Sequence, residues 1–468
     1  MSSFRPMTVR SLLLVLAVLL AGPARAQTVP VGDWSGTLTF GEQSLQMVLH
    51  VAAGDGGPAV TLDVPAQGGF GLPATSAEAR NDSLLLRYDA FGARFALAVT
   101  PDSLHGRFAQ GMADLPITFT PGEPLRRPQT PAPPFPYAEE DAAVTAADGA
   151  TLAGTFVRPD GAGPFAAVLL LTGSGPQDRD ESLFGHRPFA VLADALARAG
   201  VASLRLDDRG TGASTGDFGA ATLDTHLADA RAARAWLAAR PDVRAVGVLG
   251  HSEGGITALR LAPDAAFVVA LAGPTVSGQA LYAEQQRRAA RLAGVDSTDA
   301  DHFAAAVGAT LDAMFARPDA DSTALAAAMT AALNDGLRPM STRGRMALGL
   351  TGPAYPQVRD ALIGFMLAPG FRSFAAYDPA ADLAAVRVPT LMLYGGKDFQ
   401  VPADQNAPPA RAALAGVAGA EVVVVDDANH LFQTADTGAL TEYGQIEETI
   451  APATLARIVE WVRTASRP

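Results

Sequence analysis

The sequence predicts an α/β protein in which a mostly parallel central sheet has helices on both faces, carries a helical insertion and is preceded by a small all-β domain. From residue 137 onward, short apolar runs typical of buried parallel strands alternate with helical stretches. Between about residues 274 and 383 this alternation stops, and the chain is Ala-rich and helical. Before residue 126, apolar and polar residues alternate as in antiparallel strands. With 468 residues, 49% of them hydrophobic, the chain is long enough for two or more domains.

Residues 1–26 have the pattern of a secretory signal peptide. Arg5 and Arg10 precede an apolar run over residues 12–21, and residues 24–26 read Ala-Arg-Ala, an A-x-A cleavage site. The apolar run is too short for a comfortable membrane span, although an uncleaved anchor is the alternative. We therefore expect an exported protein, periplasmic or extracellular, with no stable membrane span after cleavage.

Residues 27–125 are predicted to form an antiparallel β domain, either a barrel or a sandwich. Runs such as Ser83–Tyr88 and Phe95–Val99 contain the alternating residues, and turn residues separate them. We expect this domain to shield or orient the site described next, with a ligand-holding barrel as the alternative. Residues 126–136 are rich in proline and predict a stiff extended linker.

The main domain, residues 137–468, opens with a predicted hairpin over residues 142–158. An apolar strand over residues 166–171 then enters the Gly-rich loop of residues 172–176. Such a loop can offer backbone N–H groups to an oxyanion or to a phosphate. Neither the Lys-Ser/Thr of a P-loop nor a G-x-G-x-x-G follows, so we do not expect a nucleotide site.

A serine stands at a predicted sharp turn from strand to helix. The apolar run over residues 246–249 leads into Gly250, Ser252 and Gly254. Glycines on either side leave room where strand and helix approach each other, and the bend lifts the Ser252 hydroxyl clear of the sheet. Because a lone G-x-S-x-G occurs by chance in many chains, its weight depends on partners elsewhere.

A serine nucleophile needs a histidine to take its proton and a carboxylate to orient that histidine. The chain has seven histidines. Six are set aside by position: His50, His105, His186, His226, His251 and His302. The first two lie in the β domain and the next two begin helical stretches. The fifth is the serine's own neighbour, whose side chain should diverge, and the sixth is expected to be exposed on an insertion helix. His430 remains, just after four valines that predict a buried parallel strand, where α/β sheets hold their chemistry.

The carboxylate should follow the preceding strand. Residues 390–394 form an apolar run, and two glycines lead to Asp398. Taken alone, Asp398 would be interpreted as a turn or N-cap aspartate. Asp426 and Asp427 are rivals, but they are so close to His430 in sequence that we expect them to shape its loop.

Ser252, Asp398 and His430 follow one another in the order that a nucleophile-elbow fold requires. We therefore predict a catalytic triad for acyl transfer. A backbone N–H of the Gly-rich loop over residues 172–176 and the N–H of Glu253 are the expected oxyanion donors, each worth roughly 3 to 4 kcal/mol in the transition state.

Three motifs resemble the α/β-hydrolase superfamily, and within it bacterial esterases of the serine-aminopeptidase-like (S33-type) group. They are residues 173–180 (GSGPQDRD), 208–216 (DRGTGASTG) and 250–255 (GHSEGG), and the resemblance covers roughly residues 137–468. By position, Ser252 matches the nucleophile, Asp398 the acid, His430 the base and Ser174 the first oxyanion donor. Many relatives have His-Gly where this chain has Thr172-Gly173, a change that keeps the main-chain donor.

The resemblance implies an α/β-hydrolase fold and cleavage of carboxylic esters through an acyl-enzyme. A peptidase, aminopeptidase or amidase with the same triad is the alternative, and a non-catalytic binding protein on this fold is the remote one. An aminopeptidase should place acids in the insertion to hold a substrate ammonium. Glu284, Asp296 and residues 299–301 are available, but acids on such helices normally face solvent.

The insertion between the sixth and seventh core strands, about residues 274–383, is expected to form a cap over the nucleophile. Six of its side chains are candidates to line the pocket or simply to fill helix cores: Met314, Phe315, Met340, Met346, Phe365 and Met366.

Arg209 follows another predicted strand and could bind an anionic substrate. We expect it instead to form a structural ion pair with Asp178, Asp180 or Glu181 that holds the oxyanion loop in shape.

Composition excludes several classes of function. Without cysteine there is no thiol nucleophile, disulfide or thiolate metal site. A net charge of −13 with no basic cluster argues against nucleic acid. We therefore expect a small-molecule substrate and no cofactor or metal. Lys397, the only lysine, is expected to point to solvent.

Overall fold

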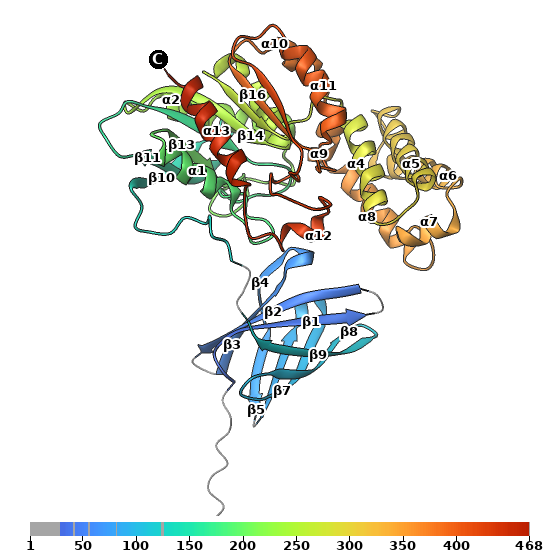
Figure 1. The fold of residues 1–468 in the computed structure, drawn as a ribbon. Coiled ribbons are helices and arrows are strands. Elements are labelled where there is room, and N and C mark those ends of the chain that lie inside the picture. The colour runs from blue at the N-terminus through green and yellow to red at the C-terminus, as the bar shows by residue number, and fades with distance from the viewer. Residues whose placement is uncertain (1–28, 41–42, 55–56, 81, 123–125, 468) are drawn as a thin grey trace, which may run out of the picture. The chain divides into compact units, whose positions relative to one another are not determined.

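The computed structural model describes residues 29–40, 43–54, 57–80, 82–122 and 126–467 (Figure 1). The predicted signal peptide, residues 1–26, lies outside this part of the chain. The chain divides into two compact units, Met1–Pro65 with Gly69–Arg126 and Ala66–Gly68 with Arg127–Pro468. None of the helices in the described ranges has the length and apolar character needed to cross a membrane.

The first unit is a nine-stranded antiparallel sheet in the order β4-β3-β2-β1-β9-β8-β7-β6-β5. Its strands are β1 (Gly32–Phe40), β2 (Gln43–Gly54), β3 (Gly57–Val64), β4 (Gly69–Pro73), β5 (Ser76–Arg80), β6 (Ser83–Tyr88), β7 (Ala93–Val99), β8 (Leu104–Gln110) and β9 (Ala113–Pro121). Alternate residues of β6 and β7 are buried, so one face carries the core. Ala74 donates its N–H to the β3 carbonyl of Val60 (2.9 Å), and the next residue, Thr75, donates to a β6 carbonyl (2.7 Å). These bonds extend the β3–β4 and β5–β6 ladders into the connection between the two edge strands, so the unit is one continuous antiparallel sheet.

The second unit contains an eight-stranded sheet in the order β10-β11-β13-β12-β14-β15-β16-β17. Its strands are β10 (Tyr137–Thr145), β11 (Thr151–Pro159), β12 (Phe165–Leu171), β13 (Ala202–Leu206), β14 (Val243–His251), β15 (Val268–Leu271), β16 (Thr390–Gly395) and β17 (Glu421–Val425). The β10, β11 and β13 pairs are antiparallel, and all pairs from β13 to β17 are parallel. The predicted fold class is confirmed.

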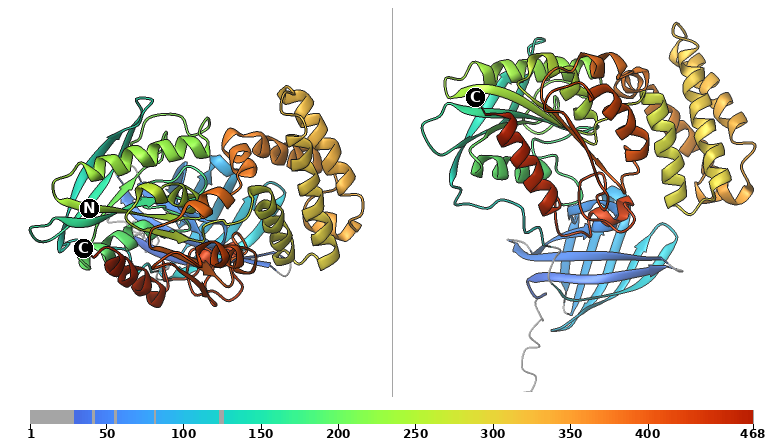
Figure 2. Two further views of the ribbon diagram at one scale, coloured as in Figure 1. Left: turned by 90° about the horizontal axis from the view of Figure 1, so that it is seen from above. Right: turned by 45° about the horizontal axis from the view of Figure 1, so that its top comes forward.

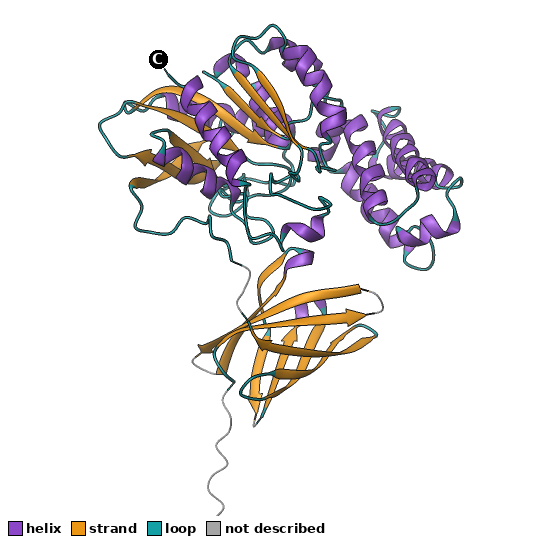
Figure 3. Cartoon of the chain, in the orientation of Figure 1, coloured by secondary structure: helices purple, strands orange, loops and turns teal. Residues whose placement is uncertain are grey.

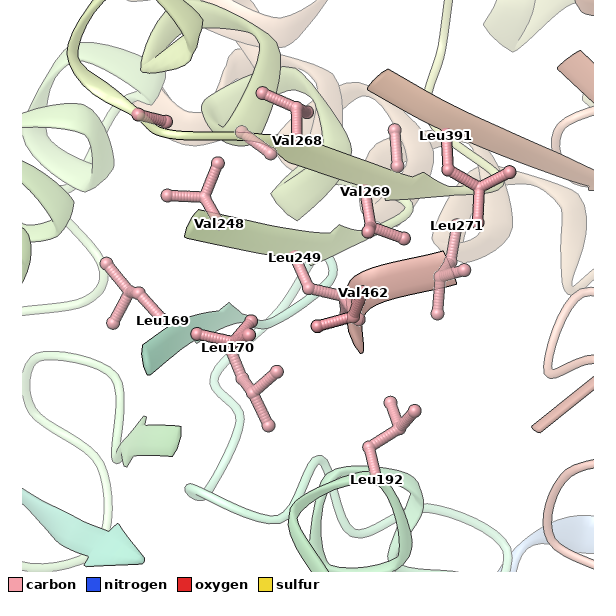
Figure 4. Close-up of a cluster of buried hydrophobic side chains, with 14 of the residues drawn as sticks. Leu169, Leu170, Leu192, Val248, Leu249, Val268, Val269, Leu271, Leu391 and Val462 are labelled. Atoms are coloured by element: carbon pink, nitrogen blue, oxygen red, sulfur yellow. The ribbon is translucent and has the colours of Figure 1, made fainter. Parts of the chain in front are cut away.

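Helices cover both faces of this sheet (Figure 1). They are α1 (Pro188–Arg198), α2 (Leu223–Ala238), α3 (Glu253–Arg260), α11 (Ala403–Leu414) and α13 (Pro452–Ala465), whereas the short α12 (Leu440–Tyr443) lies in the segment between β17 and α13. Leu249 of β14 points toward Leu192 of α1 and Val462 of α13, whereas its neighbour Val248 points to the opposite face (Figure 4). Both side chains are fully buried, which explains why the central strands are apolar throughout rather than alternating.

The four valines predicted to form a buried strand lie in β17 and are only half-buried. The reason is their position, because β17 is the last strand of the sheet and pairs only with β16.

The predicted helical insertion follows β15 and precedes β16, the sixth and seventh strands of this sheet. It consists of α4 (Gly278–Leu292), α5 (Ser297–Phe315), α6 (Ser322–Gly336), α7 (Thr342–Ala347), α8 (Tyr355–Leu367), α9 (Pro369–Ala376) and α10 (Ala380–Ala385). The described residues of this segment contain no strand (Figure 3). Helices α4 to α8 form a bundle that projects from the sheet (Figure 2) and has its own hydrophobic core. We call residues 274–385 the cap.

The predicted linker is fastened to the second unit. Arg127 donates from its guanidinium to the carbonyls of Gly444 (2.6 Å) and Ile446 (3.1 Å). Gln129 donates to the carbonyl of Ile450 and accepts from its N–H. This part of the segment therefore lies along the second unit instead of acting as a free spacer.

Candidate active site

Ser252 lies at the bend between β14 and α3 with a positive φ of 53°. This conformation is costly for a side chain other than glycine and marks a position that its surroundings enforce. A Cβ on Gly250 would overlap the carbonyl of Gly254, and a Cβ on Gly254 would overlap the carbonyl of Leu171 in β12. The glycines therefore permit the close approach of strand and helix that the sequence pattern predicts.

His430 and Asp398 form a buried pair at the carboxyl ends of β17 and β16. Nδ1 of His430 lies 2.7 Å from Oδ2 of Asp398. The other carboxylate oxygen, Oδ1, accepts the N–H groups of Gln400 (2.7 Å) and Val401 (3.0 Å). Burial disfavours the charged carboxylate, but His430 and the two N–H donors outweigh it, so the pKa of Asp398 is lowered. An ionised Asp398 accepts the Nδ1 hydrogen and leaves Nε2 as the basic nitrogen of His430.

The rival carboxylates do not orient His430. Asp426 and Asp427 are exposed, and Asp427 lies 3.4 Å from Nζ of Lys397. Lys397 also donates to the carbonyl of Ala435 and is half-buried, so the expectation that it points to solvent is wrong.

His251 places the backbone of Ser252 close to His430. The rings of His251 and His430 have centroids 4.7 Å apart, and Ser252 follows His251 directly. Within the described chain, Oγ of Ser252 makes no hydrogen bond. Hydrogen bonds between nucleophile and base are often long before substrate binds and shorten in the complex.

Two N–H groups are free at the predicted oxyanion site. The N–H of Gly173 donates to Oε1 of Glu181 (2.7 Å) and is therefore occupied. The N–H groups of Ser174 and Glu253, the two predicted donors, have no hydrogen-bond partner among the described residues. Glu253 begins α3, where the helix dipole adds partial positive charge.

Asp208 anchors the oxyanion loop, a role that sequence reasoning missed. Its carboxylate accepts from the Thr172 hydroxyl (2.7 Å) and from the N–H of Gln177 (2.9 Å). Thr172 thus fixes the loop by a side-chain bond. Burial raises the pKa of Asp208 to about 7.

Arg209 makes a structural ion pair, but its predicted partners are wrong. It donates to Asp229 of α2 (2.7 and 2.9 Å) and to Asp148 of the β10–β11 turn (2.9 Å). Arg209 and Asp208 are neighbours whose side chains diverge, so only Asp208 reaches the oxyanion loop. Of the predicted partners, Asp180 instead contacts Arg187 and Arg205.

His251 and Glu181 were not predicted as site residues. His251 is 6% exposed, and its ring lies 2.9 Å from Glu181 Oε1 through Nδ1 and 2.9 Å from the His430 carbonyl through Nε2. No local pattern reveals this contact, because Glu181 lies 70 residues earlier in the chain.

A cavity of about 370 Å³ opens beside Ser252. Besides Ser174, Ser252 and Glu253, it is lined largely by apolar and aromatic side chains: Phe218, Leu281, Tyr282, Phe365, Phe371, Phe374 and Val401. His226 and Gln285 also line it. Burial lowers the pKa of His226 and raises that of Glu253 to about 7.

Of the six cap side chains proposed to line the pocket, Phe365 does so. Met314, Met340 and Met366 are buried in the cap core, which is the alternative the sequence allowed. Met346 is 65% exposed. His302, expected to be exposed, is half-buried.

Comparison with known proteins gives a family match and several relatives. Residues 148–407 match the family model described as X-Pro dipeptidyl-peptidase (S15 family). This range includes Ser252 and Asp398 and ends before His430. The chain is 27% identical over 283 residues to esterase EstD of Thermotoga maritima, a match covering 60% of this chain and 58% of that relative. The chain thus spans under two thirds of the curated relative it matches.

Solved structures with a similar fold include esterase Pf2001 of Pyrococcus furiosus (16% identity, TM-score 0.42, 74% of this chain and 99% of that one). A hydrolase of Pseudomonas aeruginosa is 22% identical, with a TM-score of 0.38, covering 69% of this chain and 98% of that one. The superfamily predicted from the motifs is confirmed at the level of α/β hydrolases, whereas the S33-type subgroup stays a prediction.

Proposed function

The chain belongs to the X-Pro dipeptidyl-peptidase (S15) family. We propose that it is a serine hydrolase that cleaves uncharged carboxylic esters through an acyl-enzyme. The observation that carries the proposal is the buried His430–Asp398 pair beside a strained Ser252 that opens into an apolar cavity.

In the acylation step, Oγ of Ser252 attacks the ester carbonyl while Nε2 of His430 takes the hydroxyl proton. Asp398 accepts the Nδ1 hydrogen and stabilises the imidazolium. The tetrahedral oxyanion accepts hydrogen bonds from the N–H groups of Ser174 and Glu253. The carbonyl–alkoxy bond then breaks, and His430 returns the proton to the leaving alcohol.

In the deacylation step, His430 takes a proton from water, which attacks the acyl carbon. The bond to Oγ breaks, the proton passes back to Ser252, and the carboxylic acid leaves. Each turnover therefore consumes one ester and one water and restores the enzyme.

The acidic side chains of the cap are not placed to bind a substrate ammonium group, which favours an ester over a peptide with a free amino terminus. Glu284 bonds to Arg287 and Arg288 (2.6 Å each), and Asp299 accepts from Ser341. Asp296 caps α5 by accepting from the N–H of Asp299. None of these acids lines the cavity beside Ser252. Glu253 does line it, but its raised pKa weakens it as a partner for an ammonium group.

The cavity also limits the size of the acyl or alcohol group. A volume of 370 Å³ lies near the small end of the range for ligand sites. We therefore expect short acyl or alcohol groups to be preferred over long ones.

The test compares p-nitrophenyl esters with aminoacyl and X-Pro anilides on the same preparation. We expect faster turnover of esters, and faster anilide turnover would establish a peptidase instead. A fluorophosphonate probe should label the wild type and fail to label Ser252→Ala, whose turnover should fall by roughly a million-fold. A folded wild type that is not labelled would indicate a binding protein.

Export after cleavage of residues 1–26 and a shielding role for the N-terminal β domain are also proposals. Fractionation of the native host, with sequencing of the mature N-terminus, tests the first.

A further inference from the structure

A second carboxylate–histidine pair lies behind the triad. Oε1 of Glu181 is 2.9 Å from Nδ1 of His251, and both residues are almost completely buried, at 1% and 6% exposure. Nε2 of His251 faces the main-chain carbonyl of His430 at 2.9 Å. Neither residue takes part in the proposed chemistry.

Both nitrogens of His251 face hydrogen-bond acceptors. A carboxylate oxygen and a carbonyl oxygen can only accept, so both bonds form together only when each ring nitrogen carries a hydrogen. Burial opposes this charge, but the attraction of Glu181 exceeds that cost and raises the pKa of His251. The pair therefore has the geometry of an imidazolium beside a carboxylate.

Glu181 also reaches the oxyanion loop. The oxygen that pairs with His251 accepts the N–H of Gly173 (2.7 Å), next to the free N–H of Ser174. A Cβ on Gly173 would lie 3.0 Å from this oxygen and 3.4 Å from Cβ of Ser252, so the three groups are tightly packed. Glu181 has a φ of 53°, a strained conformation for a residue with a side chain.

Glu181 thus joins Gly173 in the loop after β12 to His251 at the end of β14, and His251 in turn contacts the loop that follows β17. Building on the proposed function, we infer that Glu181 and His251 are positioning residues that hold the Ser174 N–H and the His430 backbone in register with Ser252. They act through other residues and do not contact the reacting atoms.

Glu181→Gln tests this role while keeping the size of the side chain. The neutral ring of His251 cannot donate from both nitrogens, and an amide NH₂ turned toward Nδ1 would face the N–H of Gly173. At least one of the three hydrogen bonds, to Gly173, to Nδ1 or to the His430 carbonyl, must therefore be lost. Misplacement of an oxyanion donor or a base by about 1 Å typically costs 10²-fold, so we expect kcat to fall roughly 10²-fold while KM changes little. Affinity for phenylboronic acid, which forms a tetrahedral adduct on serine, should fall by the same factor.

The matched control is Asp180→Asn, one residue away. Asp180 is 4% exposed and pairs with Arg187 and Arg205 rather than with the catalytic loops. We expect this variant to lower the melting temperature at least as much as Glu181→Gln, with kcat within about threefold of wild type because no catalytic group moves.

His251→Phe provides a second, independent variant. If the two residues act as one unit, this variant should lose about as much kcat as Glu181→Gln, and the double variant should lose no more. The inference would be overturned by any of three results: a kcat loss in Asp180→Asn equal to that in Glu181→Gln, additive kcat losses in the double variant, or an unchanged affinity of Glu181→Gln for phenylboronic acid. These outcomes differ from failure of the proposed function, in which the wild type itself would neither turn over esters nor react with a fluorophosphonate.

Discussion

Replacement of Asp398 by asparagine should inactivate the enzyme by imposing the wrong histidine tautomer. Oδ1 of Asp398 accepts two main-chain N–H groups, from Gln400 and Val401. An asparagine must place its oxygen at the Oδ1 position to accept these two N–H groups. Its NH₂ group then takes the position of Oδ2, which in the wild type lies 2.7 Å from Nδ1 of His430. His430 would then accept at Nδ1 and carry its hydrogen on Nε2, which cannot take the proton of Ser252. A wrong tautomer costs about 10⁴-fold in kcat, or about 5.4 kcal/mol of transition-state stabilisation.

The assay is steady-state hydrolysis of a short p-nitrophenyl ester, with circular dichroism to show that the variant is folded. KM should change little, because the amide has nearly the size of the carboxylate. Asp426→Asn and Asp427→Asn are the controls, since both side chains are exposed and lie in the loop of His430. A folded Asp398→Asn variant that retains more than a tenth of wild-type kcat would refute the assignment. So would an equal loss in either control.

Three further predictions concern packing, specificity and pH. Gly254→Ala should destabilise the protein by about 1–3 kcal/mol or more, because the new methyl overlaps a β12 carbonyl; an unchanged midpoint in urea would contradict the close approach. Phe365→Ala should enlarge the pocket and raise kcat/KM for octanoate relative to butyrate esters by about tenfold or more, because each substrate methylene held in an apolar pocket contributes roughly 1–3 kcal/mol. An unchanged ratio would show that Phe365 does not set the acyl preference. His50 lies between Asp63 (2.9 Å) and Asp33 (2.6 Å), whose attraction outweighs the opposing effect of burial and raises the pKa of His50 from the ordinary 6.5 to about 9. The contribution of charged His50 to stability should therefore be complete below pH 6.5 and decline as the pH rises through 9. Melting temperatures measured across this pH range should show the decline in the wild type and not in His50→Gln.

The sequence predicted the parts of the site that depend on local pattern. Glycines two residues from Ser252, and apolar strands ending just before Asp398 and His430, are short-range features with direct steric or solvation causes. Parallel strands place their carboxyl ends at one edge of a sheet, so three such endings imply one site. The helical character of the cap followed in the same way from composition and the absence of strand patterns.

The partners of individual side chains could not be predicted in this way. Arg209 was expected to reach the oxyanion loop, but its neighbour Asp208 does so, because adjacent side chains diverge and the loop's path decides which one points inward. His251 was set aside because its side chain should point away from that of Ser252. That divergence directs the His251 ring to Glu181 and to the His430 carbonyl.

The sequence by itself therefore determined the strands of the sheet and the turn at Ser252, because each is encoded within a few residues, and the order of the strand endings predicted the triad. Only the tertiary structure decided the anchoring of the oxyanion loop by Asp208, the pairing of Glu181 with His251 and the aromatic lining of the cavity. These depend on contacts between segments far apart in the chain, where distance and burial, not sequence spacing, select the partner.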